Sequence, residues 1–107
     1  MNKSNIFAKI PKDLPQEIFE NIIVSESVKI ERIISDGHTS PKEGWYDSEL
    51  NEWVILLQGN AVLEFKDAVS IELDVGDFIN IPAHTKHKVT YTSSEEKTVW
   101  LAVHYAV

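Results

Sequence analysis

The sequence predicts an all-β domain of about eight or more short antiparallel strands. Apolar residues alternate with a period of two over several short stretches, and turn-forming residues separate these stretches. No segment after residue 17 has the period of an amphipathic helix. This pattern is typical of a barrel or sandwich. Residues 1–16 contain Pro11 and Pro15 and no steady period, so we expect an N-terminal arm followed by one domain at residues 17–107.

The individual strands are predicted from apolar alternation between turn signals. In chain order they are Glu17–Ser25, Val28–Ser35, Glu52–Gln58, Ala61–Phe65, Val69–Leu73, Phe78–Ile81, His87–Thr92 and Thr98–Ala106. Gly59-Asn60 is interpreted as a two-residue hairpin turn, because glycine accepts the positive φ that such turns require. Gly76-Asp77 is interpreted as a second turn, and Pro82–Lys86 as a loop.

Composition excludes several classes of function. The net charge is −7, and Lys and Arg form no patch, which argues against nucleic acid or an anionic membrane surface as partner. There is no cysteine, so disulfides, cysteine-bound zinc and thiol nucleophiles are excluded. The longest apolar run, Trp53 to Leu57, is too short to span a bilayer. We therefore expect a cytoplasmic protein.

One long segment, Asp36–Asn51, interrupts the strand pattern. It is rich in polar and turn-forming residues but carries two adjacent aromatics, Trp45 and Tyr46. A loop of this length in a compact domain is usually functional or mobile. We hypothesise that it closes over the mouth of the barrel, with Trp45 and Tyr46 forming a wall of a pocket.

Two residues at strand ends are candidates for a site. Glu52 shares a strand face with Val54 and Leu56, so it needs a partner, a metal or access to water. His87 begins a strand and shares a face with Val89 and Tyr91, which would place it at the barrel mouth if that face points inward. Either residue could instead have a purely structural role.

Further candidate ligands lie in loops. His84 precedes His87 by three residues, His38 lies early in the long segment, and Asp47 precedes Glu52 by five residues. A histidine with two carboxylates is a workable ligand set for Zn²⁺, Mn²⁺, Fe²⁺ or Ni²⁺. His104, on the last predicted strand beside Trp100 and Ala102, is interpreted as structural.

Over roughly residues 28–105 the chain resembles a small single-domain cupin of the RmlC-like superfamily. Gly76, Pro82 and His87 match the spacing of the family's second motif, although His84 stands where the family has glycine and Tyr91 where it often has asparagine. Glu52 and Gly59 match the end of the first motif, but Trp45-Tyr46-Asp47 replace its His-x-His pair.

The resemblance implies a jelly-roll-like cupin barrel, also called a double-stranded β-helix. It also implies a small-molecule ligand, bound at a divalent metal. Glu52 and His87 carry over directly as ligands, while Asp47, His84 or His38 could complete the set and Trp45, Tyr46 and Tyr91 could line the pocket.

Three functions stay open at this point. A metal-dependent isomerase, lyase or dioxygenase of unknown substrate is the first. A non-catalytic module that senses a ligand or metal is the second. The third is a metal-free pocket like that of a sugar epimerase, with His87, Asp47 and Tyr91 as an acid–base set.

The sequence also predicts assembly. Trp53, Ile55 and Leu57 occupy the strand face opposite Glu52, and only one face of a strand can point into a small barrel. Either the strand Glu17–Ser25 or a second chain must cover them. The resemblance favours a homodimer whose interface includes this face or the Glu17–Ser25 strand, which would also protect strand edges.

Overall fold

The computed structural model describes residues 1–106, which form eight strands and no helix. The strands are β1 (Ile18–Val24), β2 (Val28–Ser35), β3 (Asn51–Gln58), β4 (Ala61–Phe65), β5 (Ser70–Leu73), β6 (Phe78–Ile81), β7 (His87–Thr92) and β8 (Thr98–Tyr105). The all-β prediction is confirmed, and the predicted bounds agree with these to within one residue at each end. In this part of the chain there is also no helical segment that could cross a membrane.

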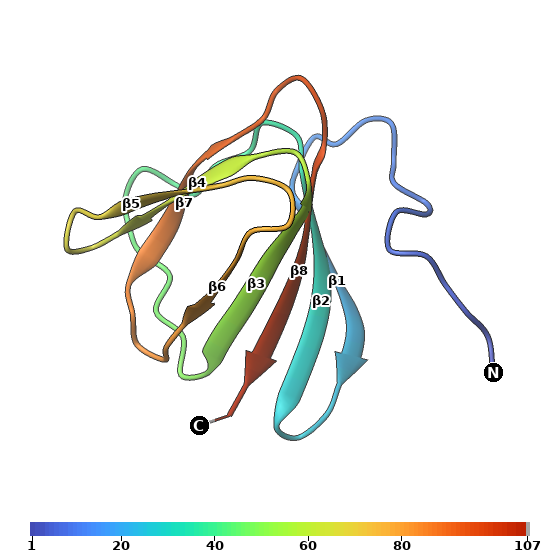
Figure 1. The fold of residues 1–107 in the computed structure, drawn as a ribbon, viewed down its shortest axis with the longest axis horizontal. Helices are drawn as coiled ribbons and strands as arrows, with labels where there is room; N and C mark the ends of the chain where they lie inside the picture. Colours follow the sequence, from blue (N-terminus) through green and yellow to red (C-terminus); the bar gives the residue numbers. More distant parts are fainter. Residues whose placement is uncertain (107) are drawn as a thin grey trace.

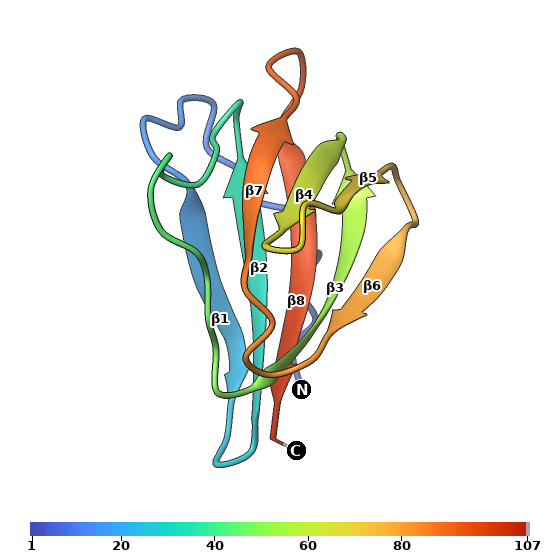
Figure 2. The same ribbon diagram turned by 90° about the vertical axis from the view of Figure 1, so that its left-hand side faces the viewer.

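The strands form two antiparallel sheets that face each other (Figures 1 and 2). The five-stranded sheet has the order β1-β2-β8-β3-β6, and the three-stranded sheet has the order β5-β4-β7. Figure 2 shows the smaller sheet in front of the larger one. Strands adjacent in a sheet are therefore often distant in the sequence, so residues far apart along the chain meet between the sheets.

The core lies between the two sheets because both contribute alternating apolar side chains. From β4, Ala61, Leu63 and Phe65 point inward, and from β3, Val54 and Leu56 do so. The cluster is completed by Leu73, Ile81, Trp100 and Ala102. The inner face of β3 is thus the face that also carries Glu52, as its alternation predicts.

The turn at Gly59-Asn60 differs from the predicted hairpin. β3 pairs with β6 and β8, whereas β4 pairs with β5 and β7, so this turn carries the chain from one sheet to the other. Gly59 has φ of +86°, and a Cβ there would lie 2.8 Å from the Cα of Thr98. Glycine is thus required by both conformation and close approach of the backbone.

The long segment after β2 runs beside β7. The Ser40 N–H donates to the Val89 carbonyl at 2.9 Å, and Tyr46 forms an antiparallel bridge with His87. These contacts continue the three-stranded sheet beyond β7. The segment therefore forms an extra wall at the side of the barrel.

The outer face of the larger sheet is covered only in part. Arg32 on β2 donates to the carbonyl oxygens of Ile6 and Ala8, at 2.9 Å and 2.6 Å, so the N-terminal arm lies against this strand. β1 pairs with β2 in the same sheet and does not cover the outer face of β3. On that face Trp53 lies 5.5 Å from Phe78 between ring centroids, and Phe78 is 64% exposed.

Candidate functional site

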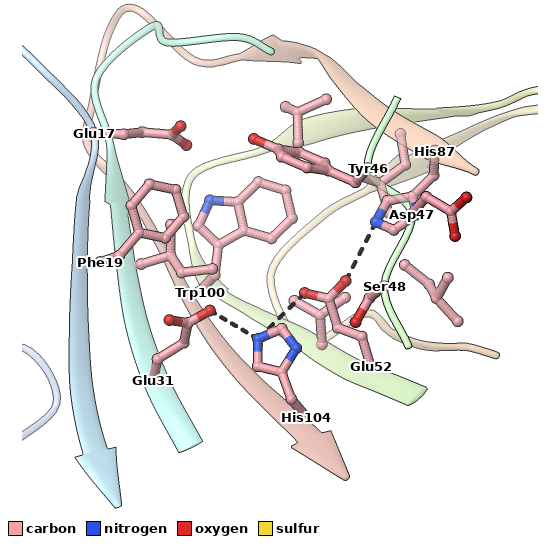
Figure 3. Close-up of a pocket in the computed structure, with 15 residues that line it drawn as sticks. Glu17, Phe19, Glu31, Tyr46, Asp47, Ser48, Glu52, His87, Trp100 and His104 are labelled. Carbon is pink, nitrogen blue, oxygen red and sulfur yellow. Dashed lines mark hydrogen bonds and ion pairs between the residues drawn. The ribbon is translucent and has the colours of Figure 1, made fainter. Parts of the chain in front are cut away.

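A pocket of about 390 Å³ opens between the two sheets, beside the long segment (Figure 3). Much of its wall is apolar or aromatic, from Phe19, Ile33, Val54, Leu63, Ile81, Val89 and Trp100. Its polar side chains are Glu17, Glu31, Tyr46, Asp47, Ser48, Glu52, His87 and His104. A concave, largely apolar site with a few convergent polar groups is typical of a small-molecule site.

His87 and Glu52 meet in this pocket. His87 begins β7 and is 6% exposed, and its Nε2 lies 3.3 Å from Oε1 of Glu52 on β3. Its Nδ1 lies 2.8 Å from the carbonyl oxygen of Thr85. Because a carbonyl can only accept, Nδ1 carries a proton and Nε2 is the nitrogen presented to Glu52.

The environment of His87 favours its protonated form. Burial lowers the pKa of His87, but the hydrogen bonds to Glu52 and to the Thr85 carbonyl outweigh burial and raise the pKa above 6.5. The ring also packs against Tyr46 and Phe65, with centroids at 5.7 Å and 6.0 Å. These contacts fix the ring in one orientation.

A second histidine–carboxylate pair adjoins the first. His104 Nε2 lies 2.8 Å from Oε1 of Glu31 and 3.8 Å from Oε2 of Glu52. Figure 3 shows the resulting line of side chains, from Glu31 through His104 and Glu52 to His87. The hydrogen bond from His104 lowers the pKa of Glu31 against the opposing effect of burial. Glu52 is thus held between two imidazoles.

Sequence reasoning missed Glu31 and His104 as members of the site. His104, for which the sequence predicts a structural role, lines the pocket and stands opposite Glu52 in the β3–β8 ladder. A usable signal was present: Glu31 shares its strand face with Ile33, and His104 shares its face with Trp100 and Ala102. Polar residues on core-facing positions of central strands need partners.

The predicted loop ligands do not join His87 and Glu52. Asp47 lines the pocket but pairs with His84 at 3.2 Å, and both side chains are largely exposed. His38 accepts from the Asp36 N–H through Nδ1, and its carbonyl accepts from Thr92, at the end of β7 opposite His87. The five predicted ligands therefore occupy three separate places.

Of the predicted pocket aromatics, only Tyr46 lines the pocket. Trp45 points to the other side, as expected for neighbours in an extended segment, and Lys88 Nζ lies 4.4 Å above its ring. Tyr91 is 47% exposed and does not line the pocket. In the ladder between β4 and β7, Val62 pairs with Tyr91, and the next residue, Leu63, pairs with Val89. Thr90 is therefore an extra residue in β7, and this bulge turns Tyr91 outward.

The donor groups of the pocket are arranged in pairs that do not suit a metal ion. Within residues 1–106 no three or more His, Asp or Glu side chains form a group that could hold one. His87 is paired with Glu52 and His104 with Glu31, so these donors satisfy one another. As arranged, they do not form the predicted divalent-metal centre.

Comparisons with known proteins identify the family. The cupin domain profile matches residues 33–104. The crystal structure of a Ralstonia eutropha protein, provisionally named a mannose-6-phosphate isomerase, is 42% identical over 100% of both chains, with a TM-score of 0.95. A cupin superfamily protein of Desulfitobacterium hafniense is 22% identical over 92% of this chain and 84% of its own, with a TM-score of 0.76.

A third structure supports the fold alone. An RmlC-like cupin of Methanocaldococcus jannaschii with a double-stranded β-helix fold is 17% identical, covers 92% of this chain and 87% of its own, and has a TM-score of 0.72. No curated protein matches the sequence. The two facing sheets, the pocket between them and the matched residues agree with one another, and the chain belongs to the cupin domain family.

Proposed function

We propose that this cupin binds a small molecule in the pocket and moves a proton on it with the His87–Glu52 pair, as an isomerase or lyase does. The observation that carries the proposal is the buried His87 ring, anchored through Nδ1 and presenting Nε2 to Glu52. A histidine and a carboxylate in this relation are typical of general acid–base catalysis. The name of the Ralstonia relative, an isomerase, supports the same class of reaction.

We propose a role for each of these side chains from its contacts. The carboxylate of Glu52 would take a proton from a carbon next to a carbonyl group of the ligand and return it to a neighbouring atom. The protonated His87, whose Nε2 faces Glu52, would stabilise the negative charge that forms on the ligand in between. His104 contacts Glu52, and Glu31 contacts His104, so both are positioning residues for Glu52. The apolar wall would limit water at the reacting carbon.

Proton transfer can be observed without knowing the natural substrate. Small ketoses and aldoses, some unsubstituted and some with a phosphate or an amino group, would be incubated with the protein in D₂O and followed by proton NMR. We expect loss of a C–H signal next to a carbonyl for at least one of them. His87→Gln should abolish this exchange, and His38→Gln, a histidine outside the pocket, should leave it unchanged. Equal exchange in the wild type and His87→Gln would contradict the proposal.

The predicted metal is tested separately. Because the donors are arranged in pairs, we expect elemental analysis of protein purified without added metal to find well below one divalent ion per chain. One tightly bound ion per chain, lost in both Glu52→Ala and His87→Ala, would instead support the metal site predicted from the sequence.

A further inference from the structure

The charge of the pocket wall limits which ligands it can accept. Four carboxylates line the pocket, those of Glu17, Glu31, Asp47 and Glu52, together with two imidazoles. None of the described residues that line it is a Lys or Arg. The wall therefore stays negative even when both imidazoles are protonated. Inside a partly enclosed site such a charge repels an anion more strongly than it would in water.

Glu17 is the carboxylate whose charge is least compensated. Glu31 is paired with His104, Glu52 with His87, and Asp47 with His84. Glu17 accepts a hydrogen bond from the Ser35 hydroxyl at 2.6 Å and forms no ion pair within residues 1–106. Its negative charge thus faces a neutral partner only.

Aromatic side chains lie next to Glu17. The indole N–H of Trp100 donates to the same Ser35 hydroxyl, at 3.4 Å, so Ser35 links the Trp100 ring to Glu17 by hydrogen bonds. Phe19 and Tyr46 also line the pocket, and Figure 3 shows Glu17, Phe19, Trp100 and Tyr46 around one end of it. Carboxylates beside aromatic faces are the groups that bind an ammonium ion.

From this combination we infer that the pocket takes a small molecule bearing a protonated amine, which lies against Glu17 and Trp100, and that it rejects phosphate esters and carboxylates. The inference rests on the proposed function, since it names the ligand class of the same pocket. The inference excludes substrates with a phosphate group as ligands of this chain, including the substrate in the name of the Ralstonia relative. The apolar wall would hold the body of the ligand, with its reacting carbon toward His87.

Three probes with one benzyl body test the inference: benzylamine as cation, benzyl alcohol as neutral molecule and phenylacetate as anion. Their dissociation constants would be measured at pH 7 by titration of ¹⁵N-labelled protein, following amide shifts of pocket residues. We expect benzylamine to bind at least about tenfold more tightly than phenylacetate, with benzyl alcohol between them, and added salt to reduce the difference. Glu17→Gln should remove most of the preference.

Glu26→Gln is the matched control. Glu26 lies in the exposed turn of the same β1–β2 hairpin, so this variant removes an equal charge outside the pocket and should keep the preference. Equal or tighter binding of phenylacetate, an unchanged preference in Glu17→Gln, or no shift of pocket residues with benzylamine would overturn the inference. None of these results would affect the deuterium-exchange test of His87, so failure of the ligand class and failure of the proposed reaction are distinguishable.

Discussion

Oε1 of Glu52 lies 3.3 Å from Nε2 of His87, and this contact joins the two sheets, because Glu52 is on β3 and His87 is on β7. The two residues are brought together by packing of the sheets and not by strand pairing. The contact spans the space in which the pocket opens. It is therefore the point at which the fold and the proposed chemistry depend on each other.

The first prediction concerns the protonation of His87. We expect NMR titration of its ring protons to give a pKa above 6.5 in the folded protein. Glu52→Gln should lower this pKa, because the hydrogen bond and charge of Glu52 disappear while burial, which disfavours the imidazolium, remains.

The same shift predicts a pH dependence of stability. A raised pKa means that the folded state binds the proton more tightly than the unfolded state does. The contribution of the His87–Glu52 pair to the free energy of unfolding is therefore fully present below pH 6.5 and is lost as pH rises through the folded pKa. Urea unfolding of the wild type and Glu52→Gln should therefore converge at alkaline pH. A difference that grows with pH would contradict the assignment.

The second prediction concerns the pair of Glu31 and His104. His104→Phe should destabilise the protein by about 1–3 kcal/mol at pH 7, because it removes the hydrogen-bond partner of the buried Glu31 carboxylate and leaves only Lys29, at 3.9 Å. The pKa of Glu31 is lowered, so this difference should be present above pH 4.5 and shrink as pH falls through the folded pKa. Urea unfolding across this pH range is the measurement. His84→Phe, at an exposed histidine, should change stability by less than about 0.5 kcal/mol.

The third prediction concerns the crossing between sheets at Gly59. Gly59→Ala should lower the free energy of unfolding by about 2 kcal/mol or more, for two reasons. Alanine is strained at a positive φ, and its Cβ would lie too close to Thr98. Gly44→Ala is the control, since Gly44 has φ of +96° but no heavy atom within 4 Å of an added Cβ. Equal losses in the two variants would show that the approach to Thr98 is relieved at no cost.

The fourth prediction concerns assembly, which we propose to be a homodimer. β1 does not cover the outer face of β3, so Trp53 and the exposed Phe78 are left for a second copy, with the edge strand β1 as a further contact surface. Light scattering at micromolar concentration should give the mass of a dimer, and Phe78→Lys should shift it toward a monomer. Tyr91→Lys, at an exposed aromatic of the other sheet, should not. A monomer mass for the wild type would refute the proposal.

The sequence by itself determined the strands and the direction of most side chains. Apolar alternation placed β2, β6 and β7 at the observed residues and put Glu52 on the inner face of β3 with Val54 and Leu56. Local chemistry suffices for such features, because the period of a strand and the φ preferences of glycine and proline act over a few residues. The spacing of Glu52, Gly76 and His87 also carried the resemblance that the family comparison confirmed.

Only the tertiary structure decided how these strands meet. In that structure β3 and β4 lie in different sheets, and the extra residue Thr90 turns Tyr91 outward. Glu31 also pairs with His104, which lies 73 positions away in the chain. Sheet pairing depends on the summed burial of many side chains and on bulges that change no local pattern, so no short stretch of sequence specifies it. For that reason the partners of Glu52 became visible only when both sheets were in place.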